Sequence, residues 1–426
     1  MKDYMFLFNL AVILLSTKVL GLLTRKIHMP QVVGALIAGV VLGPAVLNVV
    51  HETEFIDMVA EIGVIILMFC AGLETDMKEL KRSGKSAFII ALIGVIVPLL
   101  GGFAVAYIFN KPGMIESDAA SPIFLQNVFM GVILTATSVS ITVETLKELG
   151  KLKTHSGNAI LGAAIIDDVL GIIALTVISG MADSSVNLSV VLLKIVAFFV
   201  VALIGGYIFY RLFKKWSDRA QDGLRRHAIV AFAFCLLLSF VSEKFFGVAD
   251  ITGAYIAGVI ISNTQKNQYL TARFDTLSYL FFSPVFFASI GLKVALPSMT
   301  INIVLFAVLF TVVAVLTKVV GCGLGAKLCG YKNYQVLRIG VGMISRGEVA
   351  LIVASKGVQL GLLGSEFVGP VVIVVVITTI ITPILLKPVF MRGPLQSIAP
   401  GEGFATNYEK VSKLHEIGLE ETQDNK

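Results

Sequence analysis

The chain has 426 residues, of which 56% are hydrophobic and 15% are charged. Soluble domains average about 45–50% apolar and about 25% charged residues, so this composition excludes an ordinary soluble enzyme. It predicts an all-α polytopic membrane protein. The net charge of +6 could suggest nucleic acid, but the basic residues concentrate in alternate loops, which excludes that partner. The four cysteines have neither paired nor metal-type spacing, and we expect no cofactor.

About thirteen apolar segments follow one another along the chain, each long enough to span a bilayer as a helix. The first lacks the cleavage site of a signal peptide, so we expect it to be a true span. The predicted spans are 4–23, 30–50, 57–75, 86–109, 122–145, 157–181, 187–213, 226–243, 249–263, 278–296, 301–328, 336–358 and 365–389.

The loops between these segments alternate in charge. One set is rich in lysine and arginine, as at 78–85 and 211–226, whereas the other is acidic or neutral, as at 110–122. The positive-inside rule places the basic set in the cytoplasm. It predicts a multi-pass protein of the cell (inner) membrane with its N-terminus outside. The C-terminus and the polar tail at 393–426 are then cytoplasmic.

Two similar stretches indicate an internal repeat. VGALIAGV at 33–40 matches TGAYIAGV at 252–259, and the same offset aligns 72–73 with 291–292. Two six-span units separated by one span have opposite orientations in the membrane. Transporters with this plan bind substrate near the midplane where the repeats meet. The sequence therefore predicts two inverted six-helix repeats.

Adjacent carboxylates, Asp167 and Asp168, interrupt the sixth apolar segment. A charge at the centre of a membrane helix costs about 2.5–3.5 kcal/mol on insertion scales. Successive helical residues point about 100° apart, so one carboxylate can face a cavity while the other faces a partner helix. Lys318, deep in the eleventh segment, is the expected partner. A buried ion pair adds little stability, so we interpret this pair as a switch; the alternative is that all three groups serve helix packing.

Two segments are expected to contain helix breaks. GVILTATSVSIT at 131–142 is dense in threonine and serine, whose hydroxyls can satisfy backbone groups freed by unwinding. GVGMISRGEVAL at 340–351 carries three glycines and an Arg-Gly-Glu. Breaks at corresponding places in two repeats point to a transport site. The alternative for the first stretch is polar contact between helices.

Three further charged residues are candidates for a role at or near this transport site. Arg346 and Glu348 are expected to pair, bracing the second break and tuning its response to pH. Glu74 lies at a predicted cytoplasmic helix end. It is either a cation filter or pH sensor, or an ordinary solvated residue.

Seven motifs in order resemble the second class of the monovalent cation/proton antiporters, which includes bacterial electrogenic sodium/proton antiporters. They are QVVGALIAGVVLGP, EIGVIILMFCAGLETD, TATSVSIT, IIDDVLGI, SPVFFASIGLKV, TKVVGCGLGAKL and MISRGEVALIVA. The resemblance covers nearly the whole chain. It implies thirteen spans, with the fifth and twelfth broken and crossing in the core.

The resemblance also implies a homodimer in which the chain divides between an ion-transport core and a dimerisation domain. The core would comprise helices 4–6 and 11–13, and the dimerisation domain helices 1–3 and 8–10. The corresponding residues are 81–184 and 299–392 for the core, 1–80 and 221–298 for the dimerisation domain, and 185–220 for the linker helix 7.

The resemblance further implies that Asp168 carries the ion and the proton, while Asp167 pairs with Lys318. Paired aspartates accompany electrogenic sodium/proton exchange in this class. Some relatives have an acid in the fifth span where this chain has Thr137 and Ser138. We expect these two hydroxyls, with unwound backbone carbonyls, to help the aspartates bind sodium transiently.

These residues predict a secondary antiporter, not an enzyme, that exchanges sodium, with lithium as a second candidate, for protons. Burial favours a protonated carboxyl group, and an empty, charged site crosses the membrane poorly. Sodium at Asp167 would break the link to Lys318 and release a second proton. The alternatives are a potassium/proton antiporter or potassium efflux system of the same fold, a sodium-coupled symporter, a channel, and a membrane scaffold.

Overall fold

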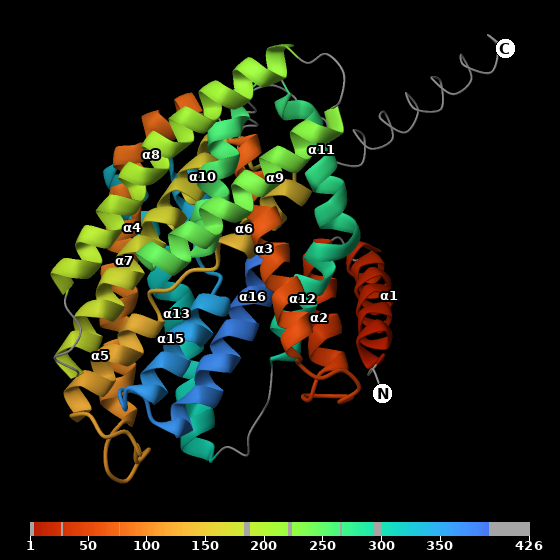
Figure 1. The fold of residues 1–426 in the computed structure, drawn as a ribbon. Coiled ribbons are helices and arrows are strands. Elements are labelled where there is room, and N and C mark those ends of the chain that lie inside the picture. The colour runs from red at the N-terminus through yellow and green to blue at the C-terminus, as the bar shows by residue number, and fades with distance from the viewer. Residues whose placement is uncertain are drawn as a thin grey trace.

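The computed structural model describes residues 4–26, 29–75, 77–182, 188–219, 224–264, 266–293 and 300–391. The named secondary-structure elements of this part of the chain are all helices, and isolated β-bridges join only Asn110 and Lys111 to Ile115 among the described residues (Figure 1). Nine of its helices are long and apolar enough to cross a membrane, and four shorter apolar helices accompany them. The predicted all-α membrane protein is confirmed at this level. The polar tail at 393–426 lies outside the described residues.

The helices follow the predicted segments in chain order. They are α1 (Met5–Lys26), α2 (Gln31–Leu42), α3 (Glu54–Glu74), α4 (Met77–Phe109), α5 (Ile123–Ile133), α6 (Val139–Glu148), α7 (His155–Ala182), α8 (Leu188–Arg219), α9 (Leu224–Val241), η1 (Ser242–Phe246), α10 (Asp250–Ser262), α11 (Asn267–Leu277), η2 (Ser278–Phe282), α12 (Ser283–Leu292), α13 (Ile301–Leu328), α14 (Asn333–Gly342), α15 (Glu348–Gln359), η3 (Ser365–Phe367) and α16 (Val368–Met391).

Several predicted boundaries differ from the structure; the fourth span, for example, was expected from 86, but α4 begins at Met77. The second helix was expected over 30–50, but α2 ends at Leu42 because the Gly43-Pro44 pair that follows cannot continue a helix. The tenth span was expected over 278–296, yet its helical path starts at Asn267. The Asn267 side-chain amide donates to the Leu73 carbonyl at 3.0 Å, so this polar end is held by a neighbouring helix.

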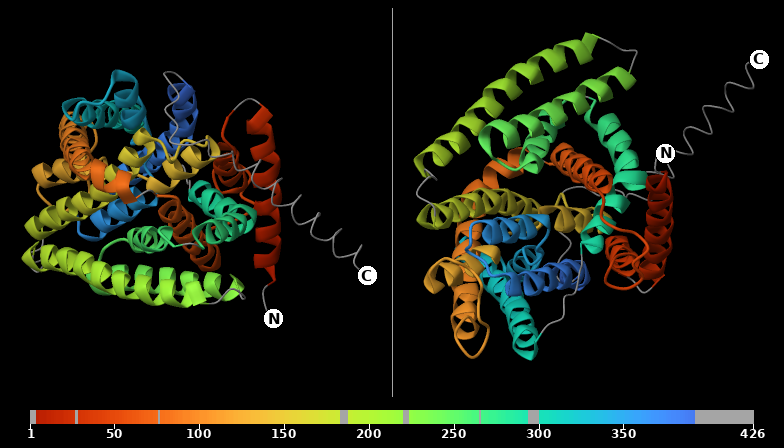
Figure 2. Two further views of the ribbon diagram at one scale, coloured as in Figure 1. Left: turned by 90° about the horizontal axis from the view of Figure 1, so that it is seen from above. Right: turned by 60° about the horizontal axis from the view of Figure 1, so that its bottom comes forward.

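Two groups of helices are evident from packing. Helix α4 lies along α13, α7 and α5, whereas α2 packs on α1 and α12, and α3 packs on α10 and α12. Seen from above, α4–α7 and α13–α16 gather on one side, and α1–α3 with α9–α12 on the other (Figure 2). Helix α8 runs along the edge of the second group.

Glycines allow the helices of the second group to approach closely. A Cβ atom at Gly39 of α2 would collide with the backbone of Ala288 in α12, and one at Gly291 of α12 would collide with α2. Helices α3 and α10 meet in the same way through Gly72 and Gly258. Backbone-to-backbone contact of this kind leaves little freedom for sliding, since no flexible side chain separates the helices.

Candidate functional site

Both predicted helix breaks are present. Helix α5 ends at Ile133 and α6 begins at Val139, while α14 ends at Gly342 and α15 begins at Glu348. Each break brings a helix C-terminus, with its partial negative charge, to the interior of the protein, followed by the positive N-terminal end of the next helix. The breaks therefore gather polar backbone groups among the long apolar helices.

The two breaks are tied to each other at one point. The Ser138 amide donates to the Ser345 carbonyl at 2.8 Å, and the Ser345 hydroxyl donates to the Ser138 carbonyl at 2.7 Å. The Thr142 hydroxyl adds a bond to the Gly342 carbonyl at 2.8 Å. Residues some 200 positions apart thereby form hydrogen bonds with backbone amides and carbonyls that lost their helical partners where the helices unwind.

Gly347 makes this close approach possible. A Cβ atom at this position would lie 2.5 Å from the Ser138 hydroxyl oxygen and 2.7 Å from the Ser138 Cβ. These distances are shorter than ordinary van der Waals contact, so a larger residue would push the two breaks apart. The glycine is therefore required by space and not by an unusual backbone angle, since its φ is −140°.

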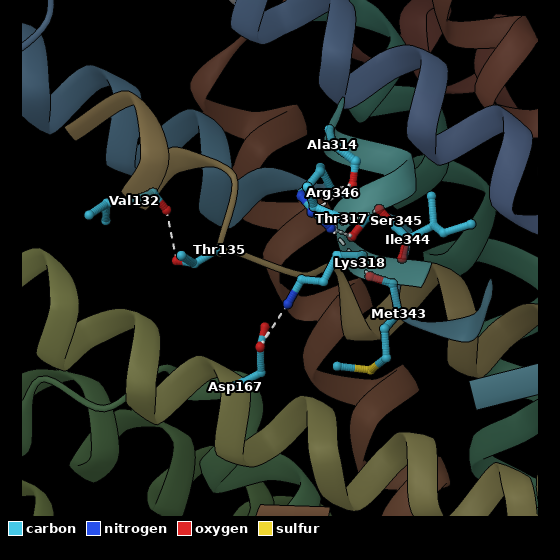
Figure 3. A network of polar contacts seen from close by, with 10 residues as sticks. All are labelled: Val132, Thr135, Asp167, Ala314, Thr317, Lys318, Met343, Ile344, Ser345 and Arg346. Carbon is cyan, nitrogen blue, oxygen red and sulfur yellow. Dashed lines mark hydrogen bonds and ion pairs between the residues drawn. The ribbon is translucent and has the colours of Figure 1, made fainter. Parts of the chain in front are cut away.

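Asp167 of α7 and Lys318 of α13 form an ion pair beside the breaks (Figure 3). The Lys318 ammonium donates to Asp167 Oδ1 at 2.7 Å, and both side chains are fully buried. Within the described residues, Asp167 Oδ2 is buried without a hydrogen-bond partner. Half of the carboxylate is thus held by the lysine, and the other oxygen retains capacity to accept a hydrogen bond or to ligate a cation.

Arg346 lies fully buried in the second break. Its guanidinium donates to the Ile344 carbonyl at 2.8 Å, to the Met343 carbonyl at 3.3 Å and to the Ala314 carbonyl of α13 at 3.3 Å (Figure 3). The positive charge therefore lies at the negative C-terminal end of α14, where it is favourable. The expected pairing with Glu348 is untested, because the Glu348 side chain lies outside the described part of the structure.

Helix α16 holds the backbone of Arg346 from the other side. The Arg346 amide donates to the Thr378 hydroxyl at 3.1 Å, and the Thr379 hydroxyl donates to the Arg346 carbonyl at 2.7 Å. Neither threonine was predicted from the sequence as a site residue. A signal was present, because three threonines fall within five residues (378–382) of an otherwise apolar segment.

Thr137 and Ser138 have different environments in the first break. The Ser138 hydroxyl lies 3.1 Å from the Ser140 hydroxyl, and the Ser138 backbone is committed to Ser345. Within the described residues, the Thr137 hydroxyl is buried and has no hydrogen-bond partner. Both residues line a narrow cavity that is also lined by Ala164 of α7.

Asp168 lies on α7, next to the ion pair, with 9% of its surface exposed. Ala164 is one helical turn before it, so the cavity beside Thr137 and Ser138 lies one turn along α7 from both aspartates. The structure thus places the breaks, the aspartates and Lys318 in one region. Oxygen atoms from carboxylates, hydroxyls and backbone carbonyls are the groups that bind hard cations.

Glu74 is remote from this region. It ends α3, and its carboxylate lies 3.6 Å from the ammonium of Lys147, which also contacts Asp275 of α11 at 2.6 Å. The side chain of Glu74 is 16% exposed, so it is not a solvated end residue. This second charged cluster was not predicted from the sequence, because its members come from α3, α6 and α11.

Comparisons with known proteins concern nearly the whole chain. A family model described as "Sodium/hydrogen exchanger, transmembrane" matches residues 11–392. The Na(+)/H(+)-K(+) antiporter GerN of Bacillus cereus is 40% identical over 391 residues, which cover 91% of this chain and 97% of that protein. The Na(+)/H(+) antiporter of Enterococcus hirae is 36% identical over 389 residues, covering 89% of this chain and 96% of the relative.

A solved structure shares the fold. The sodium proton antiporter MjNhaP1 from Methanocaldococcus jannaschii superposes with a TM-score of 0.66, covering 90% of this chain and 96% of the other. The two sequences are 18% identical, so the likeness concerns the arrangement of helices and not the chemistry of the site.

Proposed function

This chain belongs to the sodium/hydrogen exchanger family, and on that premise we propose that it exchanges sodium for protons across a membrane, with Asp168 as the carrier. Members of this family are transporters and not enzymes. The observation that carries the proposal is the fully buried Asp167–Lys318 pair, which adjoins Asp168 at the crossing of two broken helices. The names of GerN and the Enterococcus hirae antiporter both include sodium and protons.

The proposed topology has thirteen membrane crossings. The nine long helices and four shorter apolar ones support this number, with α5–α6 and α14–α15 each counted as one broken crossing. The N-terminus would lie outside and the C-terminus in the cytoplasm, because the basic loops fall on one side. The membrane would be the bacterial cell membrane.

The crossings form two inverted repeats in this proposal. Helices α2 and α3 of the first repeat correspond to α10 and α12 of the second. The glycine contacts support this correspondence. Helix α2 meets α12 backbone to backbone through glycines, and α10 meets α3 in the same way. A two-fold axis in the membrane plane exchanges these two contacts, and this is the arrangement expected for inverted repeats.

The two packing groups correspond to the proposed domains. The group of α4–α7 and α13–α16 would be the moving core, and the group of α1–α3 and α9–α12 would be the static domain that forms a homodimer. Tight glycine packing in the second group supports a rigid role for it. Helix α8 would link the two domains.

Asp168 would bind either sodium or a proton, and never both. Burying an ionised carboxylate costs free energy, so the core would move only when Asp168 is loaded, which couples the two ion flows. Sodium that also engages Asp167 would release Lys318, and loss of a proton from the lysine would make exchange electrogenic. Lithium, a small cation that prefers oxygen ligands, would be a second substrate.

Thr137 is the hydroxyl best suited to complete the sodium site. Its buried oxygen has no partner among the described residues, whereas Ser138 is engaged in the crossing. Arg346 would act as a structural brace of the second break, because its donors are directed to backbone carbonyls.

The decisive test is exchange by purified protein in proteoliposomes. Asp168→Asn should abolish proton movement driven by sodium, because the amide can neither load a proton nor neutralise a cation. Thr137→Val, which keeps the shape and removes the hydroxyl, should raise the KM for sodium. Sodium-driven proton movement that survives in Asp168→Asn would refute the assignment of the carrier.

Potassium/proton exchange is a second candidate, because the name of GerN includes potassium as well as sodium. Proton flux with sodium, lithium and potassium compared at clamped voltage separates the candidates. If potassium drives proton flux and sodium does not, potassium is the principal ion.

A further inference from the structure

Helix α6 extends from the first break to the side of the protein where the basic loops gather. It begins at Val139, directly after Ser138, and ends at Glu148. Its first residues belong to the crossing, and its last residues contact helices of the other packing group. A single helix of ten residues thus connects the candidate ion site to the proposed cytoplasmic surface.

Two kinds of polar contact hold the C-terminal end of α6. The Lys147 ammonium lies 2.6 Å from Asp275 of α11 and 3.6 Å from Glu74 of α3. The Glu148 carboxylate accepts the backbone amides of Gln31 at 2.7 Å and Val32 at 3.2 Å. These amides are the first of α2, where a negative charge is favourable because the helix dipole is positive.

The Lys147 contacts differ from the other described ion pairs in what they join. Asp167–Lys318 lies within the proposed core, and Lys293 with Glu52 and Asp57 lies within the proposed static domain. Lys147 instead joins the two. Its side chain is 13% exposed and that of Asp275 is 11% exposed, so water screens this pair less than a surface pair.

We infer that Lys147 and Asp275, assisted by Glu74 and Glu148, form a latch that closes the cytoplasmic mouth in the state seen here. The inference rests on the proposed function, since it assigns α6 to the moving core. Opening the site to the cytoplasm separates α6 from α2, α3 and α11 and therefore breaks these contacts. The latch stabilises the closed state and so governs how often the mouth opens.

A cysteine pair tests whether α6 must separate from α11. Lys147→Cys with Asp275→Cys is bridged in proteoliposomes by a short bifunctional thiol reagent, with the four native cysteines (Cys70, Cys235, Cys322 and Cys329) replaced by alanine. Exchange should fall to the level of protein-free vesicles and return when the bridge is reduced. The matched control, Lys293→Cys with Asp57→Cys, lies within the static domain, and its bridge should leave exchange unchanged.

The outcomes distinguish the latch from the proposed function. If the unbridged pair exchanges sodium and the bridged pair does so equally fast, the latch is refuted and the function stands. If wild-type protein moves no protons with any of the three cations, the function fails.

If the protein shows no transport, backbone hydrogen exchange still tests the latch. Lys147→Gln should increase backbone hydrogen exchange at Gln31 and Val32 and along α11, whereas Lys293→Gln should not. Equal protection of these amides in wild type and Lys147→Gln would overturn the inference.

Discussion

Neutralising one member of the Asp167–Lys318 pair should destabilise the protein far more than neutralising an exposed pair. Both side chains are fully buried, so water does not screen the charge left behind. Removing one partner of a buried ion pair costs about 3–5 kcal/mol. We expect Lys318→Gln to lower the free energy of unfolding by about this amount. Lys293→Gln is the matched control, because this lysine is 32% exposed and an exposed pair contributes about 0–1 kcal/mol.

The double variant separates the interaction energy of the ion pair from the effect that each residue has on stability by itself. Asp167→Asn with Lys318→Gln leaves two neutral amides that can hydrogen-bond to each other, so no buried charge is stranded. Its destabilisation should be smaller than the sum of the two single changes, with a coupling of about 0.5–3 kcal/mol. Equilibrium unfolding in mixed micelles, followed through the fluorescence of Trp216 on α8, measures wild type, the two single variants, the double variant and Lys293→Gln. Additive losses, or equal losses in Lys318→Gln and Lys293→Gln, would contradict the reasoning.

The remaining predictions concern the crossing. Gly347→Ala should destabilise the protein by about 1–3 kcal/mol and slow exchange, since its Cβ would lie 2.5 Å from the Ser138 hydroxyl. In the control Gly171→Ala the added Cβ would meet no atom within 4 Å, so this change within α7 should neither destabilise the protein nor slow exchange. Thr379→Val should cost about 1 kcal/mol by removing the bond to the Arg346 carbonyl, and Thr379→Ser should restore stability in thermal denaturation.

Charges in apolar segments made part of the site predictable. Asp167 and Asp168 are conspicuous because carboxylates are rare in membrane spans, and Lys318 stood out as a lysine deep within a predicted span. The breaks could be located from glycine, serine and threonine density. These signals are local in sequence. Each predicts either a helix end or a charge whose burial costs free energy, without knowledge of the fold.

Contacts between distant segments could not be predicted in the same way. The Ser138–Ser345 bonds depend on how two helices cross, and no local pattern encodes that register. Arg346 was expected to pair with a carboxylate two residues away. The structure directs its guanidinium to carbonyls at the end of α14, because a broken helix leaves those carbonyls without helical partners. The pairing with Glu348 stays a prediction, since that side chain lies outside the described part of the structure.

The two breaks are similar in backbone and different in charge, which bears on where a cation would bind. At the end of α14, Arg346 brings a full positive charge to the free carbonyls. At the end of α5, the Val132 carbonyl is bonded by the neutral amide and hydroxyl of Thr135, at 2.9 and 2.7 Å. Both ends carry the negative pole of a helix dipole, but an arginine compensates it at one end and neutral groups meet it at the other. We therefore expect a mobile cation to be repelled from the α14 end and attracted to the α5 end, where the Thr137 hydroxyl has no hydrogen-bond partner among the described residues.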